Sequence, residues 1–194
     1  MADRGGAPAE LPEDEFAARA LLHRHLRDAG VGARYYDLRL ADVIGGPAVA
    51  AWLSGGGFGR SLALGQGLTL HSTSPDAYTC LALLCRAYVV SGCDAVMVSL
   101  RGLADELAGR RDGRAEQSAV LLVAGWYGLG LCPLDSIDTG RVEDLMRRRL
   151  DERQPTHLLD EVPHPEVGGW WTTWIIQRFA ECNESITIAR RGRR

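Results

Sequence analysis

The chain has 194 residues, of which 46% are hydrophobic, and this is enough for one domain with a substantial core. Its 22 basic and 25 acidic residues nearly balance, so no overall field favours nucleic acid or a membrane surface. Every basic side chain counted is an arginine, because the sequence contains no lysine. Chemistry that requires a lysine is therefore excluded.

The amino terminus and the cysteines predict a cytoplasmic protein. The first residues contain no apolar signal core, and the longest apolar run is too short and too rich in glycine for a membrane span. The five cysteines form no C-x-x-C pair and lie mostly in apolar segments; they are Cys80, Cys85, Cys93, Cys132 and Cys182. We interpret them as buried free thiols in a reducing compartment rather than as a metal site or a disulfide framework.

Composition divides the chain into four parts: a disordered amino terminus, a helical segment, a core and a basic tail. Their predicted bounds are 1–12, 13–67, 68–189 and 190–194. The first part is rich in Ala, Gly, Pro and acids, and the last is the loose run RRGRR. In the helical segment we predict an amphipathic helix over 13–30 and two short helices over 40–56 and 58–67.

The core alternates between short apolar strands and helices. We predict strands at 68–72, 94–99, 119–124, 156–160 and 185–189, and helices at 77–91, 101–109, 138–152 and 170–182. This alternation is typical of a parallel α/β sheet that is covered on both faces. Ligands bind beyond the carboxyl ends of the strands in such sheets. The candidate loops therefore begin at Ser72, Leu100, Ala124 and Asp160.

The order and spacing of these elements resemble a known family. The segments that carry the resemblance are GLTLHSTSPDAYTCLALLCRAYVVSGCDAVMVS, AVLLVAGWYGLGLCP, PTHLLDEVP and IIQRFAECNESITI. They are similar to the AAA+ core of DnaC/IstB-type helicase loaders and transposition ATPases over residues 34–189. The resemblance implies a five-stranded parallel sheet of the P-loop NTPase-like (AAA+/RecA-type) kind, sandwiched by helices, after an N-terminal helical segment.

The positions that hold phosphate in this family carry other residues here. The family's G-x-x-x-x-G-K-T loop falls on Ser72, Ala77, Tyr78 and Thr79, so only the final threonine matches. The lysine of that loop reaches the β and γ phosphates, and a charge-assisted contact contributes ~1.5 to 3 kcal/mol. No other segment can supply the contact, because the chain has no lysine.

The metal-binding and sensor positions differ in the same way. The family's Mg²⁺-binding and water-activating carboxylates fall on Ala124 and Gly125, which offer no side-chain oxygen. The polar sensor falls on Asp160 and Glu161, which would repel a triphosphate beside the first strand. The resemblance thus implies an ATPase scaffold without ATPase chemistry and without a cofactor. An alternative treats THLLDE as a metal-binding motif and retains ATP and Mg²⁺.

Two groups on the last predicted helix are candidates for contact with other subunits. Arg178 matches the region in which these loaders carry an arginine that reaches a neighbouring subunit's nucleotide, although a surface ion pair is the alternative. Trp170, Trp171 and Trp174 open the same helix, and one of them cannot share a face with the others. Both core packing and an anchor for a partner remain open for these tryptophans.

A run of arginines on the preceding helix is a candidate DNA contact. Arg147, Arg148 and Arg149, together with the basic tail, are suited to DNA phosphates, and a solvated helix face is the alternative.

The leading hypothesis is a catalytically inactive, helicase-loader-like protein that acts by contact in replication or transposition of a phage or mobile element. Its expected partners are a replicative helicase, an active AAA+ subunit or a second copy of itself, with DNA as a further candidate and no membrane. The alternatives are a weakly hydrolysing ATPase of the loader type and an unrelated small-molecule enzyme that uses the same crevice.

Overall fold

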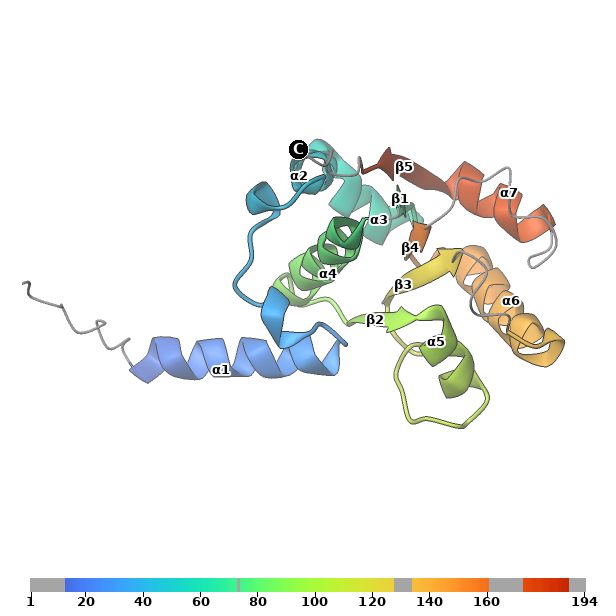
Figure 1. Ribbon diagram of the computed structural model, residues 1–194, viewed down its shortest axis with the longest axis horizontal. Coiled ribbons are helices and arrows are strands. Elements are labelled where there is room, and N and C mark those ends of the chain that lie inside the picture. The colour runs from blue at the N-terminus through green and yellow to red at the C-terminus, as the bar shows by residue number, and fades with distance from the viewer. Residues whose placement is uncertain (1–12, 73, 128–133, 161–172, 189–194) are drawn as a thin grey trace, which may run out of the picture.

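The computed structural model describes residues 13–72, 74–127, 134–160 and 173–188 (Figure 1). Its helices are α1 (Glu13–Asp28), α2 (Gly46–Trp52), α3 (Phe58–Leu64), α4 (Pro75–Val90), α5 (Leu100–Leu107), α6 (Ser136–Asp151) and α7 (Thr173–Cys182). Its short helical turns are η1 (Ala33–Tyr35), η2 (Leu40–Asp42) and η3 (Leu53–Gly57). Its strands are β1 (Gly67–His71), β2 (Ala95–Ser99), β3 (Val120–Tyr127), β4 (Thr156–Asp160) and β5 (Asn183–Thr187).

The five strands form one parallel sheet in the order β2-β3-β4-β1-β5. The predicted α/β fold with a five-stranded parallel sheet is confirmed, and β4 lies beside β1 as the resemblance implied. One strand is longer than predicted, because β3 continues past Ala124 to Tyr127. Since all strands run the same way, their carboxyl ends meet along one edge, where the candidate site lies.

Helices cover both faces of the sheet (Figure 1). They bury two apolar clusters. On one face α4 and the N-terminal segment pack against strand residues that include Leu68, Leu70 and Leu122. On the other face α5, α6 and α7 pack against the alternate residues, among them Val98 and Val123. Each such side chain contributes ~1.5 to 3 kcal/mol when it is fully buried. Both faces of the sheet are therefore covered by a buried apolar core.

The end of α1 covers the edge strand β2. Gly30 follows the helix with a φ of 82°, and the preceding carbonyl, of Ala29, accepts a hydrogen bond from Met97 N at 2.7 Å. A Cβ at Gly30 would lie 2.2 Å from Met97 O, so only glycine fits there. This contact protects an edge that could otherwise pair with another chain.

The amino-terminal half of α1 extends away from the core, and its Phe16 is 68% exposed (Figure 1). No helix in the described ranges is long and apolar enough to cross a membrane.

The four described cysteines are free. Cys80 and Cys85 are buried, while Cys93 and Cys182 are partly buried; Cys132 lies outside the described residues. Burial raises the pKa of Cys80 to about 11 and that of Cys85 to about 12. These two thiols are therefore unreactive at neutral pH.

Candidate functional site

The loop between β1 and α4 is shorter than a phosphate loop requires. Ser74 is the N-cap of α4, since its Oγ accepts a hydrogen bond from Asp76 N, and Pro75 occupies the first helical position. The helix therefore begins at Pro75. The sequence analysis predicted a start at Ala77, two residues later.

Every described backbone N–H from residue 72 to residue 77 already has an acceptor. Ser72 N donates to the last carbonyl of β4 at 2.9 Å, and Ser74 N donates to Ser72 Oγ at 3.0 Å. Asp76 N donates to Ser74 Oγ at 3.3 Å, and Ala77 N donates to Ser74 O at 3.0 Å. Pro75 has no N–H at all. A phosphate cradle needs N–H groups that point at the ligand, and this described loop offers none.

The side chains at the phosphate-loop positions are engaged within the protein as well. Ser72 Oγ donates to the carbonyl that follows β5 at 2.8 Å, and Thr79 Oγ1 donates to the carbonyl four residues earlier at 3.3 Å. Ala77 is fully buried. The Tyr78 ring lies 5.8 Å from that of Tyr35, and burial raises the pKa of Tyr78. The residue at the lysine position thus packs against the N-terminal segment.

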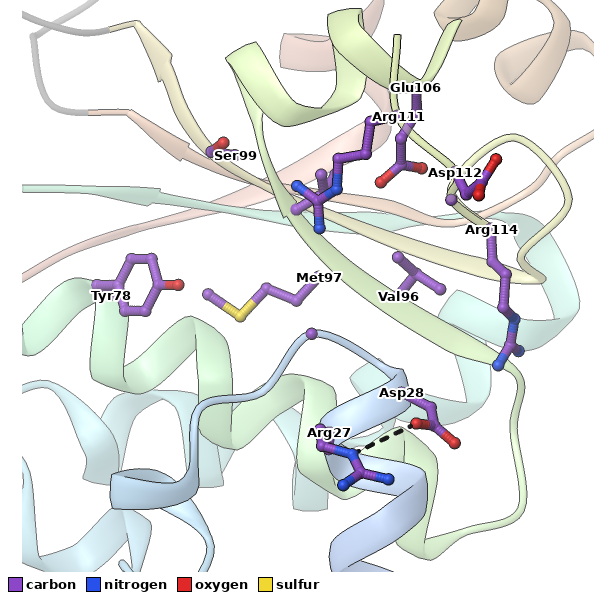
Figure 2. A pocket seen from close by; sticks show the side chains of 13 residues that line it. Arg27, Asp28, Tyr78, Val96, Met97, Ser99, Glu106, Arg111, Asp112 and Arg114 are labelled. Carbon is purple, nitrogen blue, oxygen red and sulfur yellow. Dashed lines mark ion pairs between the residues drawn. The ribbon is translucent and has the colours of Figure 1, made fainter. Parts of the chain in front are cut away.

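A cavity of about 660 Å³ extends along the outer edge of β2, with Tyr78 at one end (Figure 2). Three arginines and three acidic residues line it. Arg27 forms an ion pair with Asp28 at 3.7 Å, while Arg111 and Glu106 face the open space (Figure 2). The sequence analysis did not predict this cavity. Because the charges of its walls balance, it has no preference for a polyanion such as a triphosphate.

The carboxyl end of β3 carries no acidic residue within the described part of that strand. Gly125 has a φ of 72°, and the register between β3 and β4 shifts after Ala124. The next acid along the chain, Asp135, caps α6, because its Oδ1 accepts a hydrogen bond from Asp138 N at 2.8 Å. In the part of the chain that the structure describes, no group of three or more His, Cys, Asp or Glu side chains could hold a metal ion.

Asp160 ends β4 as a buried carboxyl group that is only 1% exposed. Its Oδ2 lies 3.4 Å from His71 Nδ1, and its Oδ1 has no hydrogen-bond partner among the described residues. Burial raises the pKa of Asp160 to about 8. The protonated carboxyl that follows at neutral pH is a poor ligand for Mg²⁺, which weighs against a metal-binding THLLDE motif. Glu161 lies outside the described residues.

No protein-family model matches the chain, and no curated protein matches it in sequence. Solved structures match its fold. The DnaC helicase loader gives a TM-score of 0.62 at 15% identity, over 81% of this chain and 100% of that chain. The structure of DnaI gives a TM-score of 0.61 at 16% identity, over 87% of this chain and 100% of that chain.

The chain shares the fold of the DnaC and DnaI structures. A structure of the replication initiator DnaA bound to AMPPCP and single-stranded DNA also matches, with a TM-score of 0.61 and 11% identity. That match covers 82% of this chain and 51% of the DnaA chain, so the present chain spans about half of that protein.

The three consecutive arginines of α6 point in different directions, since neighbouring helical residues are about 100° apart. Arg149 is 1% exposed, so its predicted contact with DNA is wrong. Its guanidinium donates five hydrogen bonds, among them those to Ser118 O at 2.8 Å and Pro155 O at 2.9 Å. Arg148 is exposed and pairs with Glu116 at 2.6 Å.

Arg147 and Trp174 join α6 to α7 on the surface. The guanidinium carbon of Arg147 lies 5.2 Å from the centroid of the Trp174 ring, and Trp174 is 39% exposed. A cation–π contact at an exposed site contributes ~0.5 to 1 kcal/mol. Trp170 and Trp171 lie outside the described residues. Of the predicted tryptophan group, Trp174 is therefore the member with a described, accessible ring.

Arg178 forms an exposed ion pair with Glu181 on α7, at a distance of 2.8 Å. Exposed pairs of this kind contribute ~1 kcal/mol or less, and an arginine held so loosely can be recruited elsewhere. The role of Arg178 at a neighbouring subunit's nucleotide stays a prediction.

Proposed function

We propose that this protein acts by contact with other proteins in DNA replication, without hydrolysing ATP. The observation that carries the proposal is the β1–α4 loop, in which the described N–H groups from residue 72 to residue 77 are all bonded internally. DnaC is a helicase loader and DnaA is a replication initiator, and the likeness to both supports a replication setting. We further infer that the DNA it helps to replicate or transpose is that of a phage or mobile element.

The energetics of the loop support an inactive site. To bind a phosphate, the loop would have to give up the hydrogen bonds of Ser72, Ser74 and Asp76, each of which contributes ~0.5 to 1.5 kcal/mol. No lysine exists in the chain to offset that loss. Binding of ATP and Mg²⁺ is therefore the hypothesis that we consider second.

The surface that we assign to a partner lies around Trp174 and Arg147. Tryptophan and arginine are the side chains most enriched at interface hot spots, and here the two stack on each other at the junction of α6 and α7. The chemistry fits a replicative helicase, an active AAA+ subunit or a second copy of this chain. Arg148, which is exposed and pairs with Glu116, is a candidate contact for DNA as a further ligand.

The proposal is tested by size-exclusion binding of the purified protein to the replicative helicase of its host, with and without ATP and Mg²⁺. We expect a complex of equal amount in both conditions. Trp174→Ala should weaken it by about tenfold or more, since hot-spot truncation costs ~2 kcal/mol or more of binding. The control is Phe16→Ala, which removes an even more exposed aromatic ring from α1 and should leave binding unchanged. A complex that needs ATP, or ATP turnover above background, would contradict the proposal.

A further inference from the structure

Three side chains form a relay across three neighbouring strands at the carboxyl end of the sheet. The His71 ring has its Nδ1 at 3.4 Å from Asp160 Oδ2 and its Nε2 at 3.3 Å from Ser185 Oγ. The strand register explains the grouping, since His71 is paired with Asp160 on β4 and with Thr187 on β5. Ser185 precedes Thr187 by two residues and therefore faces the same side of the sheet.

Burial decreases along the relay from the acid to the hydroxyl. Asp160 is fully enclosed, the His71 side chain is 20% exposed, and Ser185 is exposed. A serine nucleophile is activated by such a set: a buried carboxyl group, a partly buried imidazole and an accessible hydroxyl. Separations of 3.3 to 3.4 Å are loose for such a set, as is common before a substrate closes the site.

We propose that Ser185 is a nucleophile for acyl transfer from small esters, with His71 as its general base and Asp160 as the positioning residue that orients the imidazole. With the Nδ1 proton of His71 directed at Asp160, the Nε2 lone pair faces the Ser185 hydroxyl. This activity goes beyond the contact function and does not depend on it.

The chemistry balances without any further reagent. Ser185 Oγ attacks the ester carbonyl carbon, a C–O bond forms, and the hydroxyl proton passes to His71 Nε2. The ester C–O bond then breaks, and the alcohol leaves with that proton. Water attacks the acyl-Ser185 carbon, gives a proton to Nε2, and Ser185 Oγ leaves and takes the proton back. The net reaction is ester and water to acid and alcohol.

The edge position of β5 supplies a donor for the oxyanion. Ile188 N donates to His71 O, so alternate N–H groups of β5 point toward β1 and the others, including that of Ser185, point to the outer edge. In the described part of the chain β5 is the last strand of the sheet on this side. The N–H of the nucleophile itself is a recurring oxyanion donor in acyl transfer.

The environment of the acid sets the pH range in which the relay can work. Asp160 Oδ1 has no hydrogen-bond partner among the described residues, so the imidazole is the contact of the carboxyl group that the structure shows. Burial raises the pKa of Asp160 to about 8, so the ionised carboxylate becomes the main form only above that pH. In that form it accepts the Nδ1 proton and stabilises the imidazolium that forms during attack.

The test treats the wild-type protein with a fluorophosphonate probe and measures its intact mass and the labelled peptide. Oγ attack on phosphorus releases fluoride, and we expect one adduct, on Ser185. Hydrolysis of p-nitrophenyl acetate is measured in parallel. Ser185→Ala should abolish both signals, and His71→Gln should slow both by about tenfold or more. Thr187→Ala, which removes an exposed hydroxyl from the same face of β5, should leave both unchanged.

Asp160→Asn separates positioning from structure, because it should lower kcat for p-nitrophenyl acetate by about tenfold or more with KM unchanged. Circular dichroism confirms that each variant is folded. The proposal is overturned if the wild-type protein forms no adduct, if the adduct lies on another residue, or if the folded His71→Gln variant reacts at the wild-type rate. The wild-type result alone decides the matter should a variant fail to fold.

Discussion

The two ends of the parallel sheet differ in how their buried polar groups are satisfied. At the amino end, Arg149 donates five hydrogen bonds around the starts of β3 and β4. Asn183 joins three strands there, since it accepts from Gly67 N at 3.1 Å and donates to Thr156 O at 3.0 Å. At the carboxyl end, Asp160 keeps an oxygen without a partner among the described residues. Arg149 and Asn183 thus connect the strands at the amino end, while the carboxyl end holds a buried carboxyl group with a raised pKa, a feature common at functional sites.

The largest effect should come from breaking the amino end. Arg149→Met removes a buried cation and leaves buried carbonyls without donors, so the free energy of unfolding should fall by ~3 to 5 kcal/mol. Urea denaturation measures the change. Arg148→Met, one residue earlier on the exposed face, is the control and should change the same quantity by ~0.5 kcal/mol or less. Equal losses in the two variants would mean that Arg149 has no special role.

At the carboxyl end, Asp160 should make the stability of the fold depend on pH. The pKa of Asp160 is about 8 in the folded protein and 3.8 ordinarily, so the folded state binds more protons between these values and loses stability as pH rises. From pH 5 to pH 7 this loss amounts to ~2 to 3 kcal/mol. Asp160→Asn should abolish this loss, so the free energy of unfolding of the variant should rise relative to that of the wild type from pH 5 to pH 7. A difference that stays constant with pH would show an ordinary carboxyl group.

A buried histidine on the opposite face of β4, His157, should lower the stability as pH falls, whereas Asp160 lowers it as pH rises. Burial first, and then the charge of Arg149, lowers the pKa of His157 to about 3 from the ordinary 6.5. The unfolded chain therefore binds the extra proton, and stability falls as pH drops below 6.5. In the Asp160→Asn background, chemical denaturation should show a loss of ~2 kcal/mol from pH 6.5 to pH 5. A flat profile would place His157 in contact with water.

The smallest effect should follow from restoring the phosphate-loop residues. The triple variant Ser72→Gly, Ala77→Gly and Tyr78→Lys should show no ATP turnover in a phosphate-release assay. The helix would still begin at Pro75, and the described end of β3 would still lack a carboxylate for Mg²⁺. Turnover in this variant would mean that the chain holds metal ligands elsewhere, with Asp160 the first to examine.

Most of the fold could be predicted from the sequence, because short apolar strands and periodic helices carry their own signals. The start of α4 was placed two residues late, although Ser74, Pro75 and Asp76 form a recognisable helix start. Arg149 could not be assigned correctly, since a run of three arginines on a helix resembles a solvated face. Its burial depends on carbonyls that precede β3 and β4, and only the assembled sheet brings these to the helix.

The relay at the carboxyl end could not be predicted from the sequence either. His71 and Ser185 are 114 residues apart, and Asp160 belongs to a third strand. Their proximity depends on the strand order β4-β1-β5 and on its register. Local sequence patterns determine neither the strand order nor the register, because non-consecutive strands become neighbours only through the crossover connections.

The central claim is that the carboxyl end of this parallel sheet does not hold ATP. Titration of the purified protein with a fluorescent ATP analogue, with and without Mg²⁺, tests it most directly, and an intact P-loop ATPase serves as the positive control. We predict no saturable change in anisotropy up to millimolar analogue, and no rise in melting temperature with ATP. A ligand at a hundred times its dissociation constant would stabilise the fold by ~2.7 kcal/mol. Saturable binding that Mg²⁺ strengthens would contradict the account.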